Sequence, residues 1–257
     1  ILDGRGARED ITRTPTHTRF GIPDEEILRR VEDFSPDVLG ISNMYTAYSG
    51  DPHRIAKIIK ERHPKLLIVF GGSHPSEFPE LVMKDKNVDM VVKGEGEEIM
   101  LNLYKAIRGD GDPTKILGVS YILDGVLHTN SDAPLIPDLD TIPNFPYHLF
   151  EHPKYDMGFL TTSRGCPYRC SYCSIRTMTG ATYRYQSADK IIEAVDILVN
   201  HYNEKAIMFY DDNFCLKSKR VHELCDKLIE NGFHEKVELS VQTRADNVLV
   251  HGGEDLV

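Results

Sequence analysis

The feature that most constrains the fold is a regular alternation of apolar, strand-like runs with amphipathic, helix-like segments. In the first half of the chain, strands are expected at 36–42, 65–72 and 88–96, and helices at 24–34, 51–63, 79–85 and 97–109. The apolar runs at 36–42 and 65–72 are typical of buried strands. The alternation therefore predicts an α/β fold with a parallel sheet between layers of helices. Residues 1–4 are expected to be the remnant of an earlier strand.

Two segments interrupt this alternation. Residues 117–130 predict a β-hairpin, because the turn-forming pair Asp124-Gly125 lies between two alternating runs. The segment 131–150 follows and is rich in proline, with Pro134, Pro137, Pro143 and Pro146. Proline lacks the backbone N–H that helices and central strands need. We expect 131–150 to be a linker between two domains, at 1–130 and 151–257.

The alternation resumes in the second domain. Strands are expected at 157–165, 205–213 and 236–246, and helices at 187–202 and 218–232. Ser187 is in the right place to cap the first of these helices, and Asn231-Gly232 to end the second. Because each strand is followed by a helix or by a loop rich in polar residues, the second domain is also expected to be α/β.

Composition excludes several classes of protein. The formal net charge is −10, so a broad basic face for nucleic acid is not expected. No apolar run is long enough to span a bilayer, and no signal peptide is recognisable. Five cysteines, three of them clustered, favour a metal site in a reducing compartment over a disulfide framework. We therefore expect a cytoplasmic protein. The chain starts without Met at "ILDG" and stops at "HGGEDLV", and we expect it to be part of a longer protein.

The clustered cysteines are Cys166, Cys170 and Cys173, in the spacing C-x3-C-x2-C. Thiolates are soft ligands that suit zinc, copper(I) and iron–sulfur clusters. A structural zinc site needs four protein ligands, and Cys215 and Cys225 do not form a second close pair. A cubane cluster held by three cysteines leaves one iron open, which accounts for the missing ligand. Three alternatives stay open: core thiols without metal, a zinc site completed by Cys215 or a histidine, and an electron-transfer cluster completed by Cys215.

The stretch "CPYRCSYC" resembles the CxxxCxxC signature of the radical S-adenosylmethionine (radical SAM) enzymes. A strand leads into it, and "AIMFYDDNF" stands where the second strand of their partial (β/α) barrel would lie. The resemblance implies that the three cysteines hold a [4Fe-4S] cluster whose open iron binds SAM. Reductive cleavage of SAM then yields a 5′-deoxyadenosyl radical. Tyr172 would lie near the adenine. Only about three of the usual six strand–helix units are present, so the barrel is incomplete.

The resemblance also implies residues that bind SAM. Asp211 and Asp212 end the second strand, where the family binds the SAM ammonium group; a helix cap or a solvated turn is the alternative. Arg244 ends the third strand, and its fork suits the carboxylate or ribose of SAM; a surface salt bridge is the alternative. Arg164 and Arg169 flank the cysteines and could temper the negative charge of a cluster, or belong to the solvated surface.

The first domain resembles the B12-binding domain of cobalamin-dependent radical SAM enzymes, which has a Rossmann-like, flavodoxin-like fold. Ser42-Asn43-Met44 stands for the SxL motif, and Gly71-Gly72, after residues 45–70, for the GG motif. Ligands of a parallel sheet bind beyond the carboxyl ends of its strands, and glycine permits close backbone approach. The resemblance implies that Ser42, Met44, Gly71, Gly72 and His74 line a cobalamin site. The alternatives are an ordinary strand-end hydroxyl, a tight turn and an exposed loop histidine.

The family's lower cobalt ligand is a histidine that would lie upstream of this chain. Asp51-Pro52-His53 imitates part of that motif but follows the wrong strand, so we expect His53 to be a surface residue at a helix start. The leading hypothesis is a cobalamin-dependent radical SAM enzyme, most commonly a transferase that methylates an unreactive carbon or phosphorus centre. A small-molecule substrate and an electron donor such as flavodoxin or ferredoxin are implied. One alternative is a cyclase or oxidoreductase whose B12-like domain no longer binds cobalamin; another is a non-catalytic iron–sulfur or zinc module.

Overall fold

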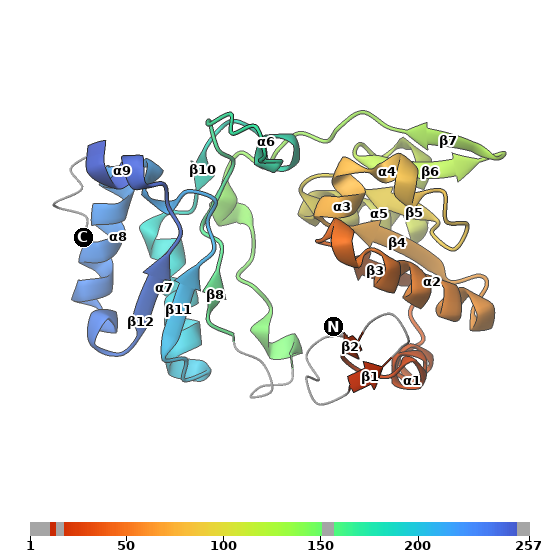
Figure 1. The fold of residues 1–257 in the computed structure, drawn as a ribbon, viewed down its shortest axis with the longest axis horizontal. Coiled ribbons are helices and arrows are strands. Elements are labelled where there is room, and N and C mark those ends of the chain that lie inside the picture. The colour runs from red at the N-terminus through yellow and green to blue at the C-terminus, as the bar shows by residue number, and fades with distance from the viewer. Residues whose placement is uncertain (1–10, 14–17, 151–156, 251–257) are drawn as a thin grey trace. The chain divides into compact units, whose positions relative to one another are not determined.

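The computed structural model describes residues 11–13, 18–150 and 157–250, which form two compact units (Figure 1). The first unit ends at Leu135 and the second begins at Ile136. The first unit has two buried apolar clusters and the second has one among the described residues. The strand predicted at 1–4 lies outside the described residues. No helix in the described ranges is both long and apolar enough to cross a membrane.

A five-stranded sheet forms the centre of the first unit, in the order β3-β4-β5-β6-β7. Its strands are β3 (Val38–Ser42), β4 (Leu67–Gly71), β5 (Met90–Val92), β6 (Val119–Leu123) and β7 (Val126–Thr129). The pairs β3–β4 and β4–β5 are parallel, whereas β6 and β7 are antiparallel to their neighbours. Ser42 pairs with Gly71, so the two strand ends that carry the predicted cobalamin motifs lie side by side.

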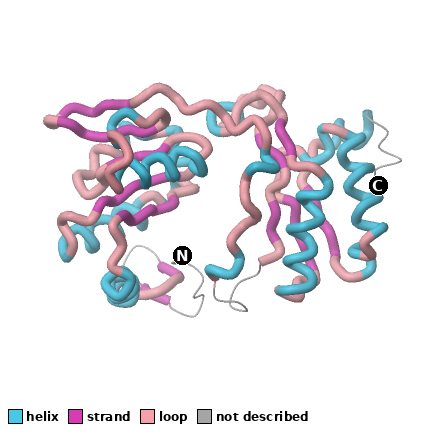
Figure 2. The backbone as a smooth tube through the Cα atoms, turned by 180° about the vertical axis from the view of Figure 1, so that it is seen from behind, coloured by secondary structure: helices cyan, strands magenta, loops and turns pink. Residues whose placement is uncertain are grey.

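Helices cover both faces of this sheet, as the apolar runs predicted, and Figure 2 shows helices flanking the strands. They are α1 (Asp24–Phe34), α2 (Gly50–Arg62), α3 (Ser73–Glu77), α4 (Pro79–Val82) and α5 (Gly96–Ile107). Ile68 and Phe70 of β4 pack in one cluster with α1 and α2. Val69, between them, belongs to the cluster on the opposite face, with Leu103 of α5. Burying such side chains stabilises the unit by about 1.5–3 kcal/mol each.

The predicted hairpin is confirmed. β6 and β7 pair in antiparallel register on either side of Asp124-Gly125. The backbone φ angles of these two residues are 51° and 77°, as a two-residue turn that follows the strand twist requires. A second small hairpin, β1 (Ile11–Arg13) with β2 (Thr18–Phe20), precedes α1 and was not predicted.

The second unit contains a three-stranded parallel sheet in the order β12-β11-β8. Its strands are β8 (Phe159–Leu160), β11 (Ala206–Phe209) and β12 (Glu238–Val241), and a separate antiparallel pair is β9 (Ser163–Arg164) with β10 (Arg184–Tyr185). Its helices are α6 (Ile175–Met178), α7 (Ala188–Asp196), α8 (Ser218–Glu230) and α9 (Ala245–Val250). Parallel strands joined through α7 and α8 form successive strand–helix units, as predicted.

Two helix boundaries follow from local chemistry that the sequence shows. The Ser187 hydroxyl accepts the backbone N–H of Lys190 at 3.2 Å, which caps α7. α7 continues as a single π-helical turn at Ile197–His201. α8 ends before Gly232, whose φ of 68° is the left-handed conformation that glycine adopts most easily.

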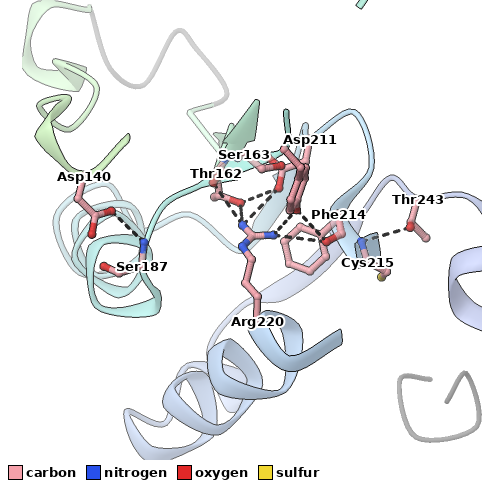
Figure 3. Close-up of polar contacts among 10 residues, drawn as sticks. Asp140, Thr162, Ser163, Ser187, Asp211, Phe214, Cys215, Arg220 and Thr243 are labelled. Atoms are coloured by element: carbon pink, nitrogen blue, oxygen red, sulfur yellow. Dashed lines mark hydrogen bonds and ion pairs between the residues drawn. The ribbon is translucent and has the colours of Figure 1, made fainter. Parts of the chain in front are cut away.

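The proline-rich segment packs on the second unit from Ile136 onward. Ile136, Leu139 and Tyr147 are buried, and burial raises the pKa of Tyr147 to about 12. The Asp140 carboxylate accepts the backbone N–H of Ser187 at 2.8 Å (Figure 3). The part of the expected linker after Leu135 is thus built into a folded unit.

Candidate functional site

The first candidate site lies where the parallel strands of the second unit end. Leu160 of β8 pairs with Phe209 of β11, and Phe209 pairs with Val241 of β12, so the three carboxyl ends lie in one row. The cysteine loop follows β8, the acidic pair follows β11, and Arg244 follows β12. The topology therefore brings the predicted cluster and SAM residues to one edge, where active sites of barrel folds form.

The three cysteines lie on one loop with free thiols. Cys166 and Cys170 are half-buried and Cys173 is exposed. The Cys173 N–H donates to the Cys170 carbonyl at 3.1 Å, which gives the loop a tight turn between these two ligands. Over the described ranges, no three His, Cys, Asp or Glu side chains are gathered closely enough to hold a metal ion, and this includes the three cysteines of the loop. Thiols are soft ligands, so the donor set of the loop suits an iron–sulfur cluster or zinc.

Gly165, directly before the first cysteine, holds the start of this loop. Its φ is 84°, and a Cβ at this position would collide with the carbonyl oxygen of Thr182. The next residue, Cys166, donates its N–H to the Gly180 carbonyl at 3.2 Å. Only glycine allows this close approach. Sequence reasoning did not single out Gly165, although a glycine beside the first ligand was the available signal.

Asp211 has no exposed surface. Its Oδ1 accepts the N–H groups of Thr162 and Ser163 at 2.5 and 3.0 Å, and its Oδ2 accepts the Thr162 hydroxyl at 2.6 Å. Nη2 of Arg220 lies 3.5 Å from Oδ2 and also donates to the Thr162 hydroxyl (Figure 3). The carboxylate thus ties the end of β11 to the end of β8. This geometry favours a structural role for Asp211 over the predicted contact with the SAM ammonium group.

Asp212 differs from its neighbour in accessibility. The Asp212 side chain is exposed to solvent. Partial desolvation by the surrounding protein, and then the negative charge of Asp211, raise the pKa of its carboxyl group. A carboxylate under this repulsion gains from a cationic partner. Of the two predicted aspartates, Asp212 is therefore the one suited to bind a ligand's ammonium group.

Arg244 reaches the cysteine loop. Its Nε and Nη2 donate to the two carboxylate oxygens of Asp246 at 2.9 and 2.8 Å. Its Nη1 lies 3.5 Å from Sγ of Cys170, and its Cζ lies 4.0 Å from the centre of the Tyr168 ring. The hydrogen bond with Asp246 raises the pKa of the guanidinium group. Sequence reasoning placed Arg244 at this edge but missed Tyr168 and Asp246.

Two asparagines that sequence reasoning also missed support this edge. Asn213 accepts the Thr243 hydroxyl at 2.9 Å, and Asn247 accepts the Tyr168 hydroxyl at 2.6 Å. Both side chains are about 1% exposed, and neither amide nitrogen has a hydrogen-bond partner within the described residues. Tyr172 is the opposite case: it is 91% exposed between the second and third cysteines, so its ring is accessible to a ligand.

The second candidate site lies at the carboxyl ends of β3 and β4. Gly72 has a φ of 101°, and a Cβ there would lie 2.9 Å from the Asn43 carbonyl oxygen and 3.2 Å from Sδ of Met44. The Asn43 N–H donates to the Gly71 carbonyl at 2.8 Å. Ser42 is exposed beside this contact. Asn43 is 2% exposed, and its side-chain amide nitrogen has no hydrogen-bond partner among the described residues. A glycine cradle beside an accessible hydroxyl fits a nucleotide-tailed cofactor.

The loop after β3 adds an exposed apolar surface to this site. Met44, Tyr45 and Tyr48 are each more than half exposed, and the two tyrosine rings meet edge to face with centroids 6.0 Å apart. Contiguous exposed apolar surface of this kind is typical of binding sites. They suit a large, flat cofactor better than a small polar one.

His74 is buried rather than exposed in its loop. Its Nδ1 lies 3.0 Å from the Thr46 hydroxyl, and its N–H donates to the Asn43 carbonyl at 3.1 Å. Burial, and then the charge of His53, lower the pKa of the ring. His53 lies at the start of α2 as predicted, but it is partly buried, with Nδ1 2.7 Å from the Asp85 carboxylate. His74 thus supports the loop from within, whereas His53 contacts Asp85 and the Phe70 ring.

Comparison with protein families matches the B12 binding domain at residues 6–104 and the Radical SAM superfamily at residues 160–252. The chain is 35% identical over 217 residues to an uncharacterized methyltransferase of Pyrococcus horikoshii, across 80% of this chain and 46% of that protein. It is 25% identical over 241 residues to the anaerobic magnesium-protoporphyrin IX monomethyl ester cyclase of Cereibacter sphaeroides, across 88% and 38%. The chain thus spans less than half the length of these relatives.

Among solved structures, the chain is similar in fold to the cobalamin-dependent S-adenosylmethionine radical enzyme OxsB with aqua-cobalamin and S-adenosylmethionine bound. The TM-score is 0.74 at 22% identity, over 88% of this chain and 33% of that one. The two matched families occur in the same order as the two folded units. This chain therefore belongs to the radical SAM proteins that carry a B12-binding domain.

Proposed function

We propose that the protein is a cobalamin-dependent radical SAM enzyme that transfers a methyl group to an unactivated centre of a small molecule. The observation that carries the proposal is the loop of Cys166, Cys170 and Cys173, which presents three free thiols at the carboxyl edge of a parallel sheet. The similarity to a methyltransferase supports the reaction type. The similarity of the fold to an enzyme with cobalamin and SAM bound supports the cofactors.

The chain's residues have distinct roles in this proposal. Cys166, Cys170 and Cys173 hold a [4Fe-4S] cluster through three of its irons. Asp212 accepts the SAM ammonium group, and the exposed Tyr172 ring stacks near the adenine. Asp211 positions the strand ends that carry these groups. The cluster supplies one electron for the reductive cleavage of SAM, and cobalamin supplies the methyl group.

The cobalamin site of the proposal is the cradle of the first unit. Gly71 and Gly72 allow the backbone to approach the nucleotide tail, and Ser42 donates a hydrogen bond to it. Met44 and its neighbouring tyrosines contact the corrin ring through their exposed apolar surface. His74 positions the loop through Thr46 rather than contacting cobalt, because its ring is buried. A low-potential donor such as flavodoxin or ferredoxin and a cytoplasmic location complete the proposal.

A second candidate is a cyclase or oxidoreductase, which the similarity to the anaerobic cyclase supports. In one form of this alternative, the B12-like domain no longer binds cobalamin. Gel filtration of the protein with hydroxocobalamin, followed by absorbance spectroscopy, separates these forms. Retention of one cobalamin per chain would exclude the form without cobalamin, and no retention would support that form.

The test of the reaction is anaerobic turnover of the full gene product with SAM, cobalamin and reductant. Methyl transfer predicts both S-adenosylhomocysteine and 5′-deoxyadenosine as products, since one SAM remethylates cobalamin and another is cleaved. Production of 5′-deoxyadenosine alone would favour the cyclase type. Zinc at one per chain without acid-labile sulfide would instead indicate a non-catalytic module.

A further inference from the structure

We propose that Arg244 is a positioning residue for the cluster: it clasps the cysteine loop and donates a hydrogen bond to Sγ of Cys170. This inference rests on the proposed function, because it requires a cluster ligated by Cys170. It differs from the SAM contact that the family resemblance implies for Arg244. We name residues 244–247 and Tyr168 together the clasp.

The backbone at Arg244 is held in place by Asn213. Oδ1 of Asn213, after β11, accepts the Thr243 hydroxyl at 2.9 Å and the Arg244 N–H at 3.3 Å. Since Asn213 is about 1% exposed, water does not compete effectively for these contacts. The end of β12 is thereby held to the turn that follows β11, and the guanidinium group starts from a defined point.

The orientation of the guanidinium group is also determined. Nε and Nη2 of Arg244 donate to the two carboxylate oxygens of Asp246, at 2.9 and 2.8 Å. This bidentate pairing leaves Nη1 at the other end of the fork, 3.5 Å from Sγ of Cys170. A SAM carboxylate would have to displace Asp246 to gain the same two bonds. The geometry therefore points the remaining donor to the cysteine.

Tyr168 provides the second attachment of the loop. Its ring lies under the guanidinium group, with Cζ 4.0 Å from the ring centre, well within the range of a cation–π contact. Its hydroxyl donates to Oδ1 of the buried Asn247 at 2.6 Å. Tyr168 lies between Cys166 and Cys170 in the chain. The stretch between two predicted ligands is thus bound at two points to residues 74 and 79 positions away in sequence.

A hydrogen bond to a cluster sulfur has a defined electronic effect. A thiolate that ligates iron keeps lone pairs that can accept an N–H, so the contact is compatible with ligation. The donor stabilises the more negative, reduced state more than the oxidised state, and so raises the reduction potential. Because Asp246 neutralises the charge of Arg244, the effect comes from the directed N–H group and not from a net positive charge nearby.

The test uses the full gene product with its cluster reconstituted anaerobically, and redox titration monitored by EPR in the absence of SAM. Arg244→Gln removes the fork, and Arg244→Lys keeps the charge without it. We expect both variants to shift the reduction equilibrium about tenfold toward the oxidised cluster. For a one-electron couple, this corresponds to a reduction potential about 59 mV lower. Lys219→Gln is the control, since Lys219 is exposed on α8, outside the cysteine loop, and should leave the potential near that of the parent.

SAM binding separates the clasp from the alternative role. If Arg244 binds the SAM carboxylate, Arg244→Gln will weaken SAM binding tenfold or more and leave the SAM-free potential unchanged, which would overturn the inference. If the parent protein forms no cluster, the proposed function fails instead. Hydrogen exchange of the apo protein is a readout that needs no cluster. Exchange in residues 166–170 should accelerate in Arg244→Gln while the β11 core stays protected, and unchanged exchange would contradict the clasp.

Tyr168→Phe keeps the test available if the Arg244 variants unfold. It retains the ring under the guanidinium group but loses the hydrogen bond to Asn247. We expect faster exchange in residues 166–170 and a potential close to that of the parent. Parental exchange in this variant would show that the loop is not held by the clasp.

Discussion

Arg220 of α8 and Asp211 after β11 form an ion pair that solvent barely reaches: Nη2 lies 3.5 Å from Oδ2, and the side chains are 3% and 0% exposed. The guanidinium group also lies 4.9 Å from the Phe214 ring centre and donates to the Thr162 hydroxyl. This network joins β8, β11 and α8 beneath the cysteine loop. It makes the position of the loop depend on a buried charge pair.

Breaking the pair should destabilise the second unit. Asp211→Asn leaves the Arg220 charge buried without its partner, and we expect a loss of about 3–5 kcal/mol in the free energy of unfolding. Urea denaturation of the apo protein measures this. Asp212→Asn is the control, because its exposed side chain should change stability by less than about 0.5 kcal/mol while weakening SAM binding. Weaker SAM binding in Asp211→Asn, with little loss of stability, would mean that Asp211 is the SAM ligand.

Gly72→Ala should abolish retention of cobalamin. The new Cβ would meet the Asn43 carbonyl oxygen at 2.9 Å, in a residue whose φ is 101°. We expect at least tenfold weaker binding of hydroxocobalamin and a loss of about 1–3 kcal/mol in stability from backbone strain. Gly40→Ala in β3 is the control, since no atom lies within 4 Å of its Cβ position. Parental cobalamin affinity in Gly72→Ala would contradict the assignment of the cradle.

Gly165→Ala tests whether the close approach before Cys166 is needed to place the cysteines. The Cβ would collide with the Thr182 carbonyl oxygen, so the loop must shift and iron loading should fall severalfold. Gly125→Ala is a control matched in backbone conformation, with φ of 77° and open space around its Cβ. It should cost about 1 kcal/mol in stability and leave iron loading unchanged. Equal loading in both variants would show that the collision does not matter.

His74 should make the first unit less stable in acid. Burial, and then the charge of His53, lower the pKa of the folded ring, whereas the unfolded chain protonates it near the ordinary value of about 6.5. The unfolded state therefore binds more protons below about pH 6.5, so stability is present above that pH and is lost as the pH falls toward the folded pKa. Urea midpoints at about pH 5.5 and about pH 8 measure the difference. His74→Gln should reduce it; an unchanged difference would exclude His74 as its source.

Much of the fold could be predicted because its determinants are local. Ser187 caps its helix, and Asp124-Gly125 forms its turn. The apolar run at 65–72 becomes β4, which is buried on both faces, whereas β3, also predicted to be buried, is an edge strand with no buried residue. The clustering of the cysteines, the acidic pair and Arg244 at one edge followed from parallel topology alone.

The partners of these residues could not be predicted in the same way. Asp211 and Asp212 are adjacent in sequence, yet one is fully buried against Arg220 and the other is exposed. The local sequence of a carboxylate at a strand end does not show which helix returns a guanidinium group to it. The contacts of Tyr168 with Asn247 and of His74 with Thr46 likewise join segments far apart in the chain. Burial created by tertiary packing decides these roles.

In the proposed enzyme, Cys166, Cys170 and Cys173 hold a cluster whose fourth iron is open to SAM. The most direct measurement is an EPR spectrum of the anaerobically reconstituted, dithionite-reduced full gene product, recorded with and without SAM. We expect a cubane signal that changes when SAM is added. A cubane signal that is indifferent to SAM, or a protein that binds zinc and forms no cluster, would contradict it.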